Sequence, residues 1–195
     1  MQLEPEPRIL IESLRDIGYS FNSALADIVD NSITARARNI SILAIPSDDF
    51  RIAIIDDGEG LGRDELMHAM RLGSTDPRCK RNLNDLGRFG LGLKTASFSQ
   101  CRRLTVVSKK NGEVNAFTWD LDLVASENKW TVLEQKRTDS IPFIGEMNET
   151  GTLVLWEKLD RLTGVNGSGK ANYDRIISEA QDYLSLVFHR YLAGE

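Results

Sequence analysis

The sequence of 195 residues has little of several features that mark specialised classes of protein. Its two cysteines, Cys79 and Cys101, are too few for a disulfide framework and do not have the spacing of a metal-binding motif. Five prolines and 15 glycines exclude a collagen-like or low-complexity chain. No apolar run approaches the roughly 18 residues that span a bilayer, and the first residues carry no signal-peptide core. We therefore expect a cytoplasmic protein in a reducing compartment, with no membrane partner.

Neither sign of charge dominates the chain. There are 24 basic and 29 acidic side chains, which give a formal net charge of -5. A mildly acidic chain does not bind nucleic acid through its bulk charge, so a nucleic-acid partner is not indicated. With 41% hydrophobic residues, the chain is long enough to bury the core of one domain, which we expect to be residues 1–195.

Local patterns predict an order of helices and strands. Helices are expected at residues 9–16, 20–38, 64–73, 93–100 and 172–192, and strands at 40–45, 51–56, 104–109, 113–121, 130–137 and 152–159. Asn111-Gly112, between two of these strands, is typical of a hairpin turn. The predicted order begins with helices, continues with a series of strands that we expect to be antiparallel, and ends with a helix. This order favours an α+β two-layer sandwich over a doubly wound sheet.

The predicted helix at 20–38 places four polar residues on one side. At about 100° per residue, Asp27, Asp30, Asn31 and Thr34 fall within an arc of roughly 100°. A solvated polar face explains this pattern without any function. Alternatively, Asp27 and Asn31 point together into a site, where an amide oxygen suits Mg²⁺ and a carboxylate can position or deprotonate water. The helix alone leaves both interpretations open.

Two further short motifs lie at strand boundaries. Asp56 ends a predicted strand and is followed closely by Gly58 and Gly60. A carboxylate there can accept a hydrogen bond from an exocyclic amine, and the glycines let the backbone approach a flat ring. An ordinary tight turn explains the same residues. Thr152 begins a later strand and, taken alone, indicates nothing more.

A glycine motif, formed by Gly87, Gly90 and Gly92, precedes a predicted helix. The unpaired N–H groups and positive dipole end of such a helix favour an anion, to which Lys94 can add a charge. A Rossmann fingerprint would follow the first strand of a βαβ unit, and the Walker A pattern is absent, which leaves a phosphate site of another kind. The polar, basic stretch at 74–86 is longer than most loops in compact domains. Loops of this length are usually functional or mobile.

In this order, the four motifs resemble the GHKL superfamily of ATP-binding domains. That superfamily includes the ATPase domains of gyrase B, MutL, MORC proteins and the large heat-shock chaperone, and the catalytic domain of sensor histidine kinases. The resemblance covers residues from about 20 to 157. It implies the Bergerat α/β sandwich, in which ATP lies between the helices under a mobile lid, here residues 74–92. It also implies ATP or ADP as ligand and Mg²⁺ as cofactor.

The resemblance assigns roles to individual residues. The segment ALADIVDNSITA (24–35) resembles the family's N-box, so Asn31 is the expected Mg²⁺ ligand that bridges to the phosphates and Asp30 a supporting polar residue. Asp56 matches the aspartate that hydrogen-bonds the adenine amino group. The remaining matches are glycines of the pocket and the lid, the lysine after them and an adenine-supporting threonine: Gly58, Gly60, Gly87, Gly90, Gly92, Lys94 and Thr152.

Two positions depart from the family pattern. In hydrolysing members the residue four before the magnesium asparagine is usually glutamate, the general base, whereas here it is Asp27. A base about an ångström out of reach can lose a large part of its rate contribution. Thr34 stands where an acidic residue is frequent. An acidic residue at position 27 nevertheless resembles the gyrase, MutL and MORC branch more than the histidine kinases, so Asp27 is the candidate catalytic residue.

These assignments lead to one main hypothesis, a nucleotide-driven conformational switch with slow ATP hydrolysis. A nucleotide-sensing module without hydrolysis and a histidine-kinase-type catalytic domain are the alternatives. The resembled branch closes an ATP-dependent homodimer and uses a lysine from a following transducer domain. No such domain fits after residue 157, so we expect the N-terminal module of a longer protein, whose client the sequence does not reveal. His68 and His189 are expected to have structural roles.

Overall fold

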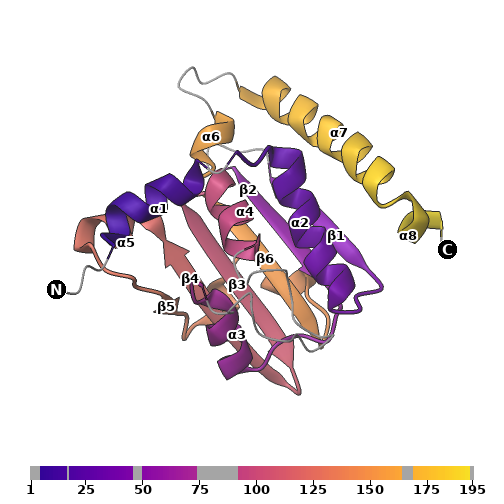
Figure 1. Ribbon diagram of the computed structural model, residues 1–195. Coiled ribbons are helices and arrows are strands. Elements are labelled where there is room, and N and C mark those ends of the chain that lie inside the picture. The colour runs from indigo at the N-terminus through magenta and orange to yellow at the C-terminus, as the bar shows by residue number, and fades with distance from the viewer. Residues whose placement is uncertain (1–4, 17, 46–49, 74–91, 164–168, 194–195) are drawn as a thin grey trace.

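The computed structural model describes residues 5–16, 18–45, 50–73, 92–163 and 169–193, and within them a single antiparallel sheet organises the chain (Figure 1). The sheet has six strands in the order β1-β2-β6-β3-β4-β5. These strands are β1 (Ile40–Ile45), β2 (Arg51–Asp56), β3 (Arg103–Lys110), β4 (Glu113–Asp120), β5 (Leu133–Glu134) and β6 (Gly151–Glu157). Helices pack on one face of the sheet (Figure 1). The α+β two-layer sandwich expected from the sequence is confirmed.

The helices follow the sequence patterns with some changes of boundary. They are α1 (Pro7–Arg15), α2 (Phe21–Thr34), α3 (Arg63–Met70), α4 (Gly92–Gln100), α5 (Leu121–Glu127), α6 (Asp160–Thr163), α7 (Gly169–Val187) and α8 (His189–Ala193). The side chain of Ser20 caps α2 by accepting a hydrogen bond from the Ser23 backbone N–H at 3.1 Å. The helix ends earlier than expected because Arg36 has φ 62°, a backbone conformation through which an α-helix cannot continue.

Strand register brings two distant sequence motifs together. β1 and β2 occupy the predicted residues, and β2 pairs with β6 so that Asp56 lies opposite Thr152. Thr152 in turn lies opposite Ser108 of β3. Asp56 and Thr152 are 96 residues apart in the sequence, so only the order of strands in the sheet makes them neighbours.

The main core lies between the helices and the sheet. The inner side of α2 contributes Leu25 and Ile28, both almost completely buried. Trp156 of β6 is fully buried, and its indole N–H donates a hydrogen bond to the hydroxyl of Ser97 on α4 at 2.8 Å. A smaller apolar cluster lies on the other face of the sheet, against residues 141–147, which include the 3₁₀ helix η2 (Ile144–Glu146) after η1 (Thr138–Ser140). The two clusters hold the central strands, and therefore the strand ends near Asp56, in place.

Three predictions of local structure were wrong. The strand expected at 130–137 is reduced to β5, and Trp130 lies outside it with 40% of its surface exposed. The strand expected to reach Leu121 ends one residue earlier, because the carboxylate of Asp120 accepts hydrogen bonds from the next backbone N–H groups and starts the unpredicted helix α5. The closing helix is divided into α7 and α8.

None of the helices in the described part of the chain combines the length and the hydrophobicity that a bilayer span requires.

Candidate functional site

A cavity of about 620 Å³ lies between α2, α3, the start of α4 and the sheet. Apolar side chains form much of its wall: Ile28, Leu61, Leu66, Leu93, Val106 and Val154. Residues from the sequence motifs converge on it, namely the two glycines Gly60 and Gly92 and the polar residues Asn31, Thr34, Asp56, Lys94 and Thr152. An apolar cavity with a few convergent polar groups is typical of a small-molecule site.

Asp56 is the most constrained polar residue in this cavity. The residue is 6% exposed, and its Oδ1 accepts hydrogen bonds from the backbone N–H groups of Gly58 at 2.9 Å and Thr152 at 3.2 Å. Its Oδ2 accepts one from the hydroxyl of Ser32 at 2.9 Å. Burial raises the pKa of Asp56, while these hydrogen bonds act in the opposite direction. Because each carboxylate oxygen has two lone pairs, Oδ2 can accept one further donor.

Ser32 is a site residue that the sequence did not reveal. It lies on the buried side of α2, where its hydroxyl bonds both the Ile28 carbonyl at 3.4 Å and Asp56. On the helical pattern this position belongs with the apolar side chains. A polar residue on an apolar helix face, immediately after Asn31, was the available signal, because a buried hydroxyl needs a hydrogen-bond partner.

Two glycines allow the backbones around the cavity to approach closely. Gly60 has φ +63°, and a Cβ there would overlap the carbonyl oxygen of Lys109 on β3. Gly151 has φ +129°, and a Cβ there would overlap the carbonyl oxygen of Asp56. A side chain at Gly151 would separate β6 from β2, and one at Gly60 would push the segment after β2 away from β3. Gly60 was singled out in the sequence, whereas the importance of Gly151 follows only from the pairing of β2 with β6.

The polar face of α2 is divided by the structure. Asn31 and Thr34 line the cavity, but Asp27 and Asp30 are not among its lining residues. Asp30 is exposed. Asp27 instead accepts a hydrogen bond from the hydroxyl of Tyr19 at 2.9 Å. The structure thus brings Asn31 to the cavity and leaves the role of Asp27 a prediction.

Lys94 places a cationic group in the wall of the cavity. The residue is 1% exposed, and its Nζ donates a hydrogen bond to the carbonyl of Ala69, in the last turn of α3, at 2.5 Å. Burial lowers the pKa of Lys94 from 10.5 to about 8. None of the ion pairs found between described residues includes Lys94. A buried cation beside the first turn of α4 is suited to an anion such as a phosphate.

Most of the expected lid lies outside the described residues. Gly87, Gly90 and the basic stretch at 74–86 lie outside the described residues, and only Gly92, the first residue of α4, is described and lines the cavity.

Among the described residues there is no cluster of three or more His, Cys, Asp or Glu that could hold a metal. The amide of Asn31 fits a Mg²⁺ ion that takes most of its ligands from phosphates and water, as this ion commonly does.

The histidines have different surroundings. His68, expected to be structural, is exposed on α3 and lines the cavity with Asp64, one turn earlier. The ring of His189 on α8 contacts the carbonyl of Leu186 at 3.0 Å. His68 therefore lies where a ligand in the cavity would meet it, and His189 does not line the cavity.

A larger cavity, of about 860 Å³, is lined by other side chains of α3. Its wall is mostly apolar and includes Leu14, Met67 and Trp119. Of its three charged residues, Arg63 and Glu134 pair with each other at 2.7 Å, and Arg71 is the third. Because few polar groups converge there, this cavity is the weaker candidate for a specific small molecule.

The fold and the cavity together define a class of protein. A buried carboxylate at a strand end, an asparagine on the facing helix and a helix N-terminus beside a lysine are the expected parts of a GHKL ATP-binding domain. Comparison with known families supports this directly. The family described as "Histidine kinase-, DNA gyrase B-, and HSP90-like ATPase" matches residues 19–151, and the chain belongs to it.

Two curated proteins illustrate the similarity. "ATPase morc-1" of Caenorhabditis elegans is 31% identical over 174 residues, covering 75% of this chain and 19% of that protein. "DNA mismatch repair protein MutL" of Dictyoglomus turgidum (strain DSM 6724 / Z-1310) is 29% identical over 97 residues, covering 49% of this chain and 17% of that protein. The chain thus spans about a fifth or less of the length of these relatives. The resemblance inferred from the four motifs is confirmed, and it supports nucleotide binding.

Proposed function

We propose that this chain binds Mg·ATP in the cavity beside α2 and acts as a conformational switch that hydrolyses the nucleotide slowly. The observation that carries the proposal is the carboxylate of Asp56, which is buried and hydrogen-bonded yet can still accept a donor from the cavity. Membership of an ATPase family adds support.

The adenine end of the ligand lies at Asp56 in this proposal. The exocyclic amine donates to Oδ2, and the ring packs between apolar side chains such as Ile28 and Val154. Thr152, whose backbone N–H already bonds Asp56, supports the base from the strand opposite. Guanine carries a carbonyl where adenine carries the amine, so the same carboxylate would repel it.

The phosphates lie toward the start of α4. The N–H groups of its first turn and the ammonium of Lys94 supply positive charge, and Asn31 supplies an amide ligand for Mg²⁺. When bound, Mg²⁺ neutralises charge that develops on the phosphate oxygens. The lid glycines Gly87 and Gly90 belong to the same proposal as contacts of the phosphates.

Hydrolysis requires a base for the attacking water. In the proposed step a water oxygen bonds to the γ-phosphorus, the bond from that phosphorus to the β,γ-bridging oxygen breaks, and Asp27 accepts the proton of the water. ADP and phosphate are the products. We expect a slow rate because aspartate is one methylene shorter than the glutamate usual in hydrolysing relatives.

A second function, nucleotide sensing without hydrolysis, is favoured by one observation. Asp27 is not among the residues that line the cavity and is already bonded to Tyr19. If wild-type protein binds ATP but releases no phosphate, the chain is a sensor.

We also propose that the longer protein forms an ATP-dependent homodimer. Size-exclusion chromatography with and without nucleotide would detect this assembly.

Substitutions at Asp56 and Asn31 test nucleotide binding. Asp56→Asn replaces an acceptor with a group that also donates, which should weaken ATP binding by about 1–3 kcal/mol. Asn31→Ala should weaken Mg²⁺-dependent ATP affinity while sparing the binding of adenosine. Titration calorimetry of each variant with ATP and adenosine, with and without Mg²⁺, measures both effects.

Asp182→Asn, an identical change at an exposed position of α7, is the matched control and should bind like the wild type. Equal ATP affinity in the wild type, Asp56→Asn and Asn31→Ala would remove the assignment of the cavity as the nucleotide site.

A further inference from the structure

Tyr19 connects the candidate general base to α4. The residue lies just before α2, is half-buried, and donates its hydroxyl hydrogen to Oδ2 of Asp27 at 2.9 Å. Its backbone carbonyl accepts a hydrogen bond from the side-chain amide of Gln100, at the end of α4, at 3.3 Å. Gln100 is itself buried. The tyrosine is therefore held at its backbone and at its hydroxyl.

The Tyr19 hydroxyl is a dependable donor at neutral pH. Burial and the hydrogen bond to the Asp27 carboxylate raise the pKa of Tyr19, while a hydrogen bond with Thr95 acts in the opposite direction. Thr95 follows Lys94 in the first turns of α4. The hydroxyl thus links Asp27 to the helix whose N-terminus faces the proposed phosphate site.

We propose that Tyr19 is a positioning residue that orients the carboxylate of Asp27 for hydrolysis. The inference rests on the proposed function, because it needs Asp27 to act as the base. A donor on Oδ2 restricts rotation of the carboxylate and leaves Oδ1 to take the proton of the attacking water. Tyr19 keeps its own proton throughout. Such a restraint matters most for aspartate, since its short side chain reaches a water from few orientations.

A purely structural role predicts different behaviour. If the hydrogen bond between Tyr19 and Asp27 only stabilises the start of α2, its removal changes the melting temperature and leaves kcat and the pH dependence of the rate unchanged. If the hydrogen bond orients the base, its removal changes kcat and the pH dependence of the rate and leaves the nucleotide affinity unchanged. The two roles therefore separate in kinetics.

Tyr19→Phe removes only the hydroxyl. We expect kcat for ATP hydrolysis by the 195-residue chain to fall about tenfold or more, with KM within about twofold of the wild type. The pH–rate profile should also change, because the hydroxyl bonds the carboxylate that takes the proton in the proposed step. Tyr183→Phe makes the same change on an exposed part of α7 and should leave kcat, KM and the profile unchanged.

The outcomes distinguish this inference from the proposed function. If Asp27→Asn abolishes hydrolysis while Tyr19→Phe keeps the wild-type kcat and pH profile, the positioning role is overturned and the ATPase proposal stands. If Asp27→Asn hydrolyses ATP normally, or the wild type does not hydrolyse it at all, Asp27 is not a base and the role of Tyr19 falls with it. Nucleotide binding is judged independently by calorimetry of Asp56→Asn. ADP affinity and melting temperature of Tyr19→Phe report whether that variant is folded.

Discussion

Lys94 shows how a single residue can oppose folding and serve a ligand. It is almost completely buried, and its pKa falls from 10.5 to about 8 because the ammonium is desolvated. The folded state therefore holds this proton less tightly than the unfolded chain does. Below about pH 8 the lysine is charged in both states, and its burial lowers the free energy of unfolding by the full amount. Between about pH 8 and 10.5 the folded protein loses the proton while the unfolded chain still binds it, so the free energy of unfolding rises with pH.

Lys94→Met removes the charge and keeps an unbranched side chain that is one atom shorter. At pH 7 we expect the variant to be more stable than the wild type, by at most about 3 kcal/mol, since one pKa unit corresponds to about 1.4 kcal/mol. Loss of the hydrogen bond to Ala69 reduces this gain. ATP affinity should fall at the same time. Denaturant unfolding at pH 7, 9 and 10 and calorimetry measure both quantities. A stability difference that does not narrow above pH 8 would contradict the argument.

At the scale of elements, the pairing of β2 with β6 builds the adenine end of the proposed site. The periodic sequence predicted both strands, but not that they are neighbours. Gly151 permits the contact, because its left-handed backbone and missing Cβ let β6 pass against the Asp56 carbonyl. The hydrogen bond from Thr152 to Asp56 depends on that approach.

Gly151→Ala tests this arrangement. The added methyl overlaps the Asp56 carbonyl, so β2 and β6 must separate locally, and we expect a loss of about 1–3 kcal/mol of stability together with weaker ATP binding. Gly112→Ala is the matched control, because Gly112 also has a positive φ but has no atom close to the position of a Cβ. It should lose stability through backbone strain alone and keep the ATP affinity. Calorimetry and thermal unfolding of both variants make the comparison.

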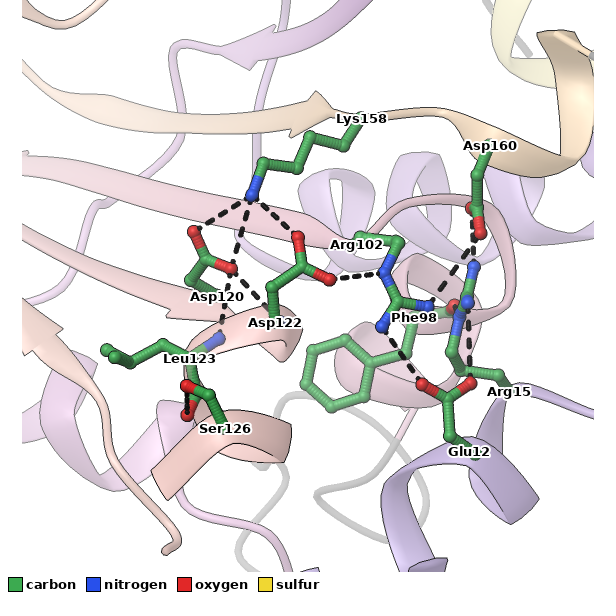
Figure 2. A network of polar contacts seen from close by, with 10 residues as sticks. All are labelled: Glu12, Arg15, Phe98, Arg102, Asp120, Asp122, Leu123, Ser126, Lys158 and Asp160. Carbon is green, nitrogen blue, oxygen red and sulfur yellow. Dashed lines mark hydrogen bonds and ion pairs between the residues drawn. The ribbon is translucent and has the colours of Figure 1, made fainter. Parts of the chain in front are cut away.

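At the scale of the whole molecule, a network of ion pairs ties the first helix to the end of the last strand (Figure 2). The buried Arg15 of α1 donates through Nε to the carbonyl of Phe98 on α4 at 2.9 Å and pairs with Asp160, at the start of α6, at 2.5 Å. Arg102 bonds Glu12 of α1 at 3.0 Å and Asp122 of α5 at 2.7 Å. None of these residues lines the candidate nucleotide cavity. The network therefore serves the assembly of the domain.

Arg15→Met should destabilise the domain by about 1–3 kcal/mol, because it leaves a buried backbone acceptor without a donor and removes one partner of a half-exposed carboxylate. Hydrogen exchange should increase in α1 and α6, while ATP affinity stays within about twofold. Arg175→Met breaks an exposed pair with Glu179 on α7 and should change stability by less than about 0.5 kcal/mol. A tenfold loss of ATP affinity in Arg15→Met would show instead that this network controls the cavity.

Local sequence was sufficient for much of the architecture and for the family. Strands β1 and β2 occupy the predicted residues, since alternation and flanking turn residues act over a few positions. The polar motifs around Asn31 and Asp56 indicated a nucleotide site because their chemistry is carried by residue type and spacing. The helix α5 was missed where capping by Asp120 overrode a strand-like pattern.

Contacts between distant residues needed the folded chain. Ser32 meets Asp56, Tyr19 meets Asp27, and Lys94 meets the carbonyl of Ala69 on a different helix. Such contacts depend on strand order, register and the packing of helices against the sheet, which no local pattern encodes. Burial is decided at the same level, and with it the altered protonation of Lys94, because a side chain is desolvated only when the elements around it have come together.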